Sequence, residues 1–78
     1  MKVKIYSTKA CPYCVMAKEF FAKKKIAYKE IDVSVHKNAD EMIEKSGQMG
    51  VPVIEIGKEI IVGFDVPRIN EVLGKKKK

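Results

Sequence analysis

Short apolar runs alternate with amphipathic segments along this chain, and the pattern predicts an α/β domain. Near the N-terminus, Val3 and Ile5 alternate with polar residues, which is typical of a strand with one buried face. Further on, Cys14, Ala17 and Phe21 recur at helical spacing and define one apolar helix face. Toward the C-terminus, strand-like alternation and helix-like spacing follow one another again.

The pattern predicts the order β-α-β-α-β-β-α. We expect strands at about residues 2–6, within 26–33, at 53–56 and at 59–62, and helices at about 12–25, 38–46 and 66–73. Strands separated by helices favour a parallel pair, whereas Gly57-Lys58 favours a hairpin between the last two strands. Gly47 and Gly74 are expected to end the second and third helices, and Asp65 is expected to cap the third. These elements predict a mixed four-stranded sheet covered by helices.

The charge is concentrated at the C-terminus. The chain has 78 residues and a formal charge of +6, and residues 75–78 are all lysines. The remaining 12 basic and 10 acidic residues leave a net charge of only +2. We therefore expect one domain over residues 1–74 and a disordered basic tail at 75–78. A nearly neutral body argues against a nucleic-acid-binding protein.

The chain lacks an apolar segment near the ~18 residues that a membrane span needs. Its first predicted strand begins directly after Met1, with no leader-like segment before it. We therefore expect a cytoplasmic protein without a membrane partner. In that compartment a cysteine pair is more often transient and catalytic than a permanent disulfide.

The two cysteines stand in the segment Cys11-Pro12-Tyr13-Cys14, between a predicted strand and a predicted helix. A free thiol, with a pKa of about 8.5, is mostly protonated at neutral pH, and the thiolate is the nucleophile. A helix N-terminus offers unpaired N–H groups and a positive dipole end to the sulfur of Cys11, and Lys9 adds positive charge nearby. Cys14 lies one turn further in and is more buried. We expect Cys11 to attack and Cys14 to resolve the mixed disulfide.

Two other interpretations of the cysteines are weaker. A zinc site usually takes four ligands, and the chain offers only Cys11, Cys14 and the distant His36. We therefore expect no metal, and we expect His36 to be a surface residue. Two buried core cysteines are also disfavoured, because proline and tyrosine between them suit a turn.

Three segments resemble the glutaredoxin family. Residues 5–14, Ile-Tyr-Ser-Thr-Lys-Ala-Cys-Pro-Tyr-Cys, are similar to its active-site segment. Gly50-Val51-Pro52-Val53 resembles its cis-proline loop, and Gly63-Phe64-Asp65 falls where the family has a Gly-x-Asp turn. The resemblance covers residues 2–74 and implies a thioredoxin-like fold.

The resemblance also implies glutathione as a co-substrate. Cys11 would be the nucleophile and Cys14 the resolving thiol. The backbone of Val51 would pair with the cysteine moiety of glutathione, like an added strand. The start of the last helix would hold the γ-glutamyl carboxylate through backbone N–H groups. The residues implied in glutathione binding are Lys9, Tyr13, Val51, Pro52, Gly63, Phe64 and Asp65.

The sequence departs from the family pattern at four positions. Thr8 stands where many members have a lysine, with Lys9 displaced by one residue. Gly50 replaces a common threonine, Val62 replaces a glycine, and Val66 replaces a polar residue. Each change removes a polar contact or alters a turn that binds glutathione in the family.

Three functions follow from the resemblance. The first is a monomeric thiol–disulfide oxidoreductase that reduces protein disulfides and glutathione mixed disulfides, with glutathione as reductant. The second is a glutaredoxin-like hydrogen donor, for example for ribonucleotide reductase, reduced by thioredoxin reductase. The third is a carrier in which two subunits hold an iron–sulfur cluster through Cys11 and two glutathiones.

Overall fold

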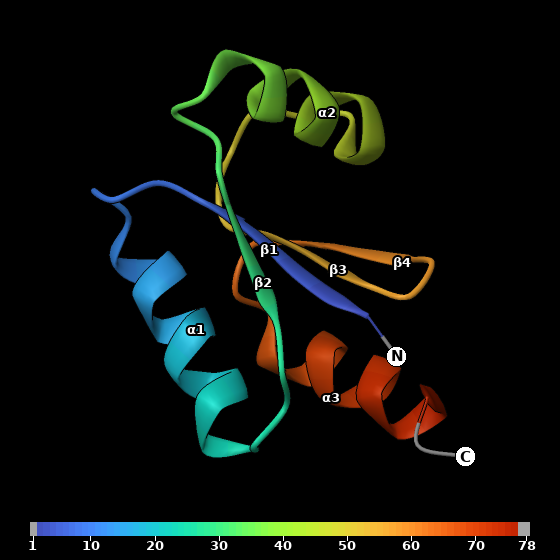
Figure 1. The fold of residues 1–78 in the computed structure, drawn as a ribbon. Helices are drawn as coiled ribbons and strands as arrows, with labels where there is room; N and C mark the ends of the chain where they lie inside the picture. Colours follow the sequence, from blue (N-terminus) through green and yellow to red (C-terminus); the bar gives the residue numbers. More distant parts are fainter. Residues whose placement is uncertain (1, 77–78) are drawn as a thin grey trace.

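The computed structural model describes residues 2–76 of the chain, and the predicted order of elements is confirmed (Figure 1). The elements are β1 (Val3–Ser7), α1 (Pro12–Lys23), β2 (Lys29–Asp32), α2 (His36–Ser46), β3 (Val53–Ile56), β4 (Glu59–Val62) and α3 (Val66–Lys76). None of the helices in residues 2–76 is long and apolar enough to cross a membrane.

The four strands form one mixed sheet in the order β2-β1-β3-β4. β1 is parallel to β2 and antiparallel to β3, and β3 and β4 form the predicted hairpin. The turn of the hairpin uses Gly57 at a φ of 60°, which glycine adopts without steric cost. The first strand therefore lies inside the sheet, and its C-terminal end leads directly to the cysteines.

Both faces of the sheet are covered, with α1 and α3 on one face and α2 on the other (Figure 1). Ile5 and Phe21 belong to the larger core under α1 and α3, whereas Tyr6 and Met42 belong to the smaller core under α2. Successive side chains of a strand point to opposite faces, so neighbours in β1 enter different cores. Packing on both faces fixes β1 in position beneath the dithiol segment.

The first helix begins and ends through its own local contacts. Pro12 occupies its first turn, where the missing N–H is not needed. The helix ends at Lys23, two residues before the predicted end. The reason is the turn that follows, in which Ile26 N–H donates to the carbonyl of Phe21 and Lys25 has a φ of 59°. The chain reverses there and enters β2.

The prediction that Gly74 ends the last helix is wrong. The helix α3 continues to Lys76, and Gly74 lies within it. Gly74 lacks the positive φ of a helix-ending glycine, whereas Gly47 has a φ of 74° directly after α2, as predicted. Residues 75 and 76 of the predicted tail are therefore helical, and residues 77–78 lie outside the described residues.

Candidate active site around Cys11 and Cys14

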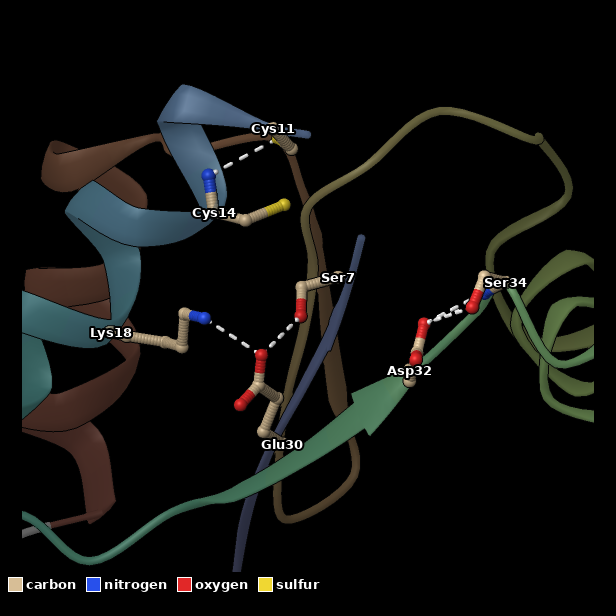
Figure 2. Close-up of polar contacts among 7 residues, drawn as sticks. All are labelled: Ser7, Cys11, Cys14, Lys18, Glu30, Asp32 and Ser34. Atoms are coloured by element: carbon tan, nitrogen blue, oxygen red, sulfur yellow. Dashed lines mark hydrogen bonds and ion pairs between the residues drawn. The ribbon is translucent and has the colours of Figure 1, made fainter. Parts of the chain in front are cut away.

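Cys11 is the N-cap residue of α1. Its backbone is extended, with φ −102° and ψ 109°, and its Sγ accepts the backbone N–H of Cys14 at 3.2 Å (Figure 2). The side chain is half-buried, and the Sγ lies 3.9 Å from the carbonyl oxygen of Val51. A thiolate at this position meets a hydrogen-bond donor and the positive end of the helix dipole. The surroundings of Cys11 are those expected of the attacking thiol.

Cys14 has different surroundings, although it lies only one turn along the same helix. Its side chain is fully buried. Burial, followed by the interaction with Cys11, raises the pKa of the Cys14 thiol to about 11. Cys14 therefore stays protonated at neutral pH and lies too deep to meet a large substrate first. This agrees with the expected roles, in which Cys11 attacks and Cys14 follows.

The loop before β3 lies beside the sulfur of Cys11. The Val51–Pro52 peptide bond is cis, as the resemblance implies, and Pro52 is buried. The carbonyl of Pro52 accepts the N–H of Gly63 at 2.8 Å. This bond joins the loop at residues 50–52 to the turn at residues 63–65. The structure therefore brings two of the three predicted segments together next to Cys11.

The turn at residues 63–65 leads into α3. Gly63 has a φ of 81°, in the left-handed region that favours glycine. The ring of Phe64 packs edge-on against Phe20 of α1 at 5.8 Å between centroids. Asp65 caps α3, since its Oδ1 accepts the N–H of Arg68 at 3.2 Å. The predicted N-cap is confirmed.

Two further predicted residues flank the dithiol at the surface. Tyr13 is 61% exposed on the first turn of α1. Lys9 is exposed in the loop before Cys11. The hydrogen bonds from Ser34 lower the pKa of Asp32 most, and the charge of Lys9 lowers it further. Tyr13 is thus available to a ligand beside Cys11, and Lys9 lies toward β2.

His36 lies away from the dithiol, as expected of a surface residue. Its side chain is 93% exposed, and its Nε2 lies 3.6 Å from Asp40 on the next turn of α2. Residues 2–76 contain no group of three or more His, Cys, Asp or Glu side chains placed to hold a metal ion.

The sequence interpretation missed a polar cluster beneath Cys14. Lys18 forms an ion pair with Glu30, with 2.7 Å between Nζ and Oε2, and the hydroxyl of Ser7 donates to the same oxygen at 3.0 Å (Figure 2). The spacing of Lys18, four residues after Cys14 on one helix face, was an available signal. Glu30 could not be found in that way, because the pairing of β1 with β2 brings it there.

Comparison with known proteins agrees with this geometry. Residues 3–61 match the family model described as Glutaredoxin. The chain belongs to the glutaredoxin family. It is 42% identical over 74 residues to a glutaredoxin-like 8.6 kDa protein in the rubredoxin operon of Clostridium pasteurianum, a match covering 94% of this chain and 99% of that protein. It is 36% identical over 64 residues to glutaredoxin 3 of Escherichia coli K12, covering 81% of this chain and 77% of that protein.

A solved structure extends the likeness to the whole fold. The glutaredoxin-like protein NrdH-redoxin of Escherichia coli superposes with a TM-score of 0.79 at 25% identity, covering 92% of this chain and 95% of the other. The predicted thioredoxin-like fold is confirmed. With the family and the Cys11–Cys14 geometry established, this glutaredoxin is a thiol–disulfide oxidoreductase whose redox-active pair is Cys11 and Cys14.

Proposed function

We propose that this glutaredoxin reduces protein disulfides and glutathione mixed disulfides, with glutathione as its reductant. The observation that carries the proposal is the position of the Cys11 sulfur. It accepts the Cys14 N–H at the start of α1 and lies beside the carbonyl of Val51, where a bound thiol peptide would meet it. The protein would act as a monomer in the cytoplasm on soluble partners.

The reaction would proceed in two exchanges. The Cys11 thiolate attacks one sulfur of the substrate disulfide, so a Cys11–sulfur bond forms and the substrate bond breaks. The leaving sulfur departs with the electron pair and takes up a proton. Cys14 or glutathione then attacks the sulfur of Cys11 and releases the second substrate thiol. Two glutathione molecules return the oxidised pair to the dithiol and leave as glutathione disulfide.

Glutathione would lie along the loops that meet at Cys11. The backbone of Val51, exposed by the cis bond to Pro52, would pair with the cysteine moiety, and Tyr13 would flank its sulfur. The γ-glutamyl carboxylate would meet the backbone N–H groups of Phe64 and Asp65. Gly63, which has no side chain, would let the turn approach glutathione closely. The ammonium of Lys9 would attract the carboxylate of the glycine moiety of glutathione. These assignments are supported by the family and by the joined loops.

The choice of reductant can be tested directly. The oxidised protein is incubated either with glutathione, glutathione reductase and NADPH, or with thioredoxin reductase and NADPH, and NADPH consumption is followed. We expect turnover with the first system, and reduction of a glutathione mixed disulfide on a peptide. Turnover with thioredoxin reductase alone would overturn the assignment of glutathione.

The second candidate is a hydrogen donor reduced by thioredoxin reductase. It is supported by the likeness to NrdH-redoxin, whose activity profile is described as thioredoxin-like. It is also supported by Thr8, Gly50 and Val66, which replace residues that contact glutathione in many family members. The two NADPH-coupled assays separate the candidates with one preparation of protein.

A further inference from the structure

Three side chains from three elements form one cluster beneath Cys14. The Nζ of Lys18, on α1, lies 2.7 Å from Oε2 of Glu30, on β2. The hydroxyl of Ser7, on β1, donates to the same oxygen at 3.0 Å, and Ser7 is only 1% exposed. The side chain of Lys18 is 25% exposed, so its ammonium is partly withdrawn from water. Glu30 therefore holds the ammonium of Lys18, and Ser7 in turn holds the carboxylate of Glu30.

This cluster lies beneath the Cys14 thiol. Lys18 follows Cys14 by four residues, so both side chains project from the same face of α1 toward the sheet. Figure 2 shows Lys18 one turn below Cys14, with its amino group directed toward Glu30 and Ser7. The ion pair ties α1 to β2 at the level of the dithiol.

The charge of Lys18 acts on Cys14 in the direction that catalysis needs. Burial, followed by Cys11, raises the pKa of the Cys14 thiol to about 11, whereas a backbone hydrogen bond with Thr8 and then the ammonium of Lys18 lower it. The other titratable group facing the thiol on α1 is Cys11, β1 contributes the neutral Ser7, and β2 contributes Glu30 through its pair with Lys18. Lys18 therefore supplies a positive charge that favours the Cys14 thiolate.

We propose that Lys18, held by Glu30, which Ser7 holds in turn, is a positioning residue that stabilises the Cys14 thiolate during resolution of the mixed disulfide. In this step the proton of Cys14 leaves to water, and a bond forms between the two cysteine sulfurs. The bond between Cys11 and the substrate sulfur breaks, and the substrate sulfur departs with the electron pair and is protonated. The inference depends on the role of Cys14 as resolving thiol in the proposed function.

The two steps can be observed in one stopped-flow trace. Reduced protein is mixed with dipyridyl disulfide, an uncharged probe that releases one thiopyridone when Cys11 attacks and a second when Cys14 resolves. Both phases are recorded from pH 6 to pH 10 for the wild type and three variants. The variants are Lys18→Met, Lys18→Arg and the control Lys29→Met, which removes the same charge from the exposed residue next to Glu30.

We expect Lys18→Met to slow the second phase about three- to tenfold at neutral pH and to shift its pH profile upward, because one pKa unit changes the thiolate fraction about tenfold. Lys18→Arg should restore the wild-type phase, and Lys29→Met should leave both phases unchanged. The first phase reports Cys11 and should change by less than about twofold in every variant.

Three results would overturn the inference. A wild-type second phase in Lys18→Met would exclude the electrostatic role and leave the proposed function intact. A slower second phase with an unshifted pH profile would show that Lys18 only maintains structure. A wild type without any second phase would refute Cys14 as the resolving thiol, and the proposed dithiol reaction would fail with it.

Discussion

Cys11 and Cys14 are the same residue type three positions apart, and their surroundings give them different roles. We predict that Cys11→Ser abolishes reduction of every disulfide substrate, because serine lacks the thiolate that attacks the disulfide and that the helix N–H stabilises. Cys14→Ser should retain reduction of small glutathione mixed disulfides and lose most dithiol reduction of proteins. Parallel assays with a glutathione mixed disulfide and a protein disulfide check this, and equal losses in both variants would contradict it.

A second feature at the residue scale is the contact between Gln48 and Gly50, which stands where many family members have a threonine. The amide of Gln48 clamps this residue, since its Oε1 accepts the Gly50 N–H at 2.5 Å and its Nε2 donates to the Gly50 carbonyl at 3.0 Å. A Cβ at Gly50 would lie 2.7 Å from that Oε1. A threonine at this position would therefore require the flexible Gln48 side chain to move away from Gly50. The clamp fixes the backbone immediately before the cis bond.

We predict that Gly50→Thr lowers the free energy of unfolding by about 0.5–1 kcal/mol, because it displaces the exposed Gln48 amide from two hydrogen bonds. The same substitution in a Gln48→Ala background should cost less, since the clamp is already absent. Urea unfolding of the two single variants and the double variant gives the coupling energy. Strictly additive losses would show that the two side chains do not compete for one position.

At the scale of the element, the two helix-associated glycines look alike in sequence and differ in conformation. Gly47 follows α2 at a φ of 74°, where its N–H donates to the carbonyl of Ile43. Gly74 lies inside α3, and nothing is within 4 Å of a Cβ built on it. A glycine before a run of lysines gives no sign of which form it takes, because lysine is itself a good helix former. The length of α3 was therefore mispredicted.

This difference gives opposite predictions for one substitution. Gly74→Ala should raise the free energy of unfolding by up to about 0.5 kcal/mol, because alanine in the last turn of a helix loses less backbone entropy than glycine. Gly47→Ala should lower it by about 1–2 kcal/mol, because the left-handed region is costly for a residue with a Cβ. Chemical denaturation measures both, and destabilisation by Gly74→Ala would contradict the helical position of this residue.

At the scale of the whole molecule, the sequence pattern predicts a mixed four-stranded sheet and the order of the elements along the chain, and the structure confirms both. Alternation in β1 identified Val3 and Ile5 as core residues, and the spacing of Phe21 identified the buried face of α1. The cluster beneath Cys14 was not predictable, because it depends on the register that pairs Ile5 with Glu30 across β1 and β2. Local periodicity identifies faces and element types, whereas register across strands determines which polar side chains meet.

The stability of the whole domain should depend on pH through Cys14. Its pKa rises from the ordinary 9.0 to about 11 in the folded protein, so between these values the folded state binds more protons than the unfolded state. The free energy of unfolding should therefore fall as the pH rises through this interval, and the contribution of Cys14 should be fully present below about pH 9.

Urea unfolding of the reduced protein at about pH 7, 8.5, 9.5 and 10.5 measures this, with Cys14→Ser as the reference because serine does not titrate in this range. The variant shares every other titrating group, so lysine deprotonation cancels in the difference between the two proteins. We expect the difference in unfolding free energy to stay constant from about pH 7 to about pH 8.5. Above about pH 9, the wild type should lose stability relative to Cys14→Ser. A constant difference up to about pH 10.5 would mean that burial in the folded domain does not hold the proton on Cys14.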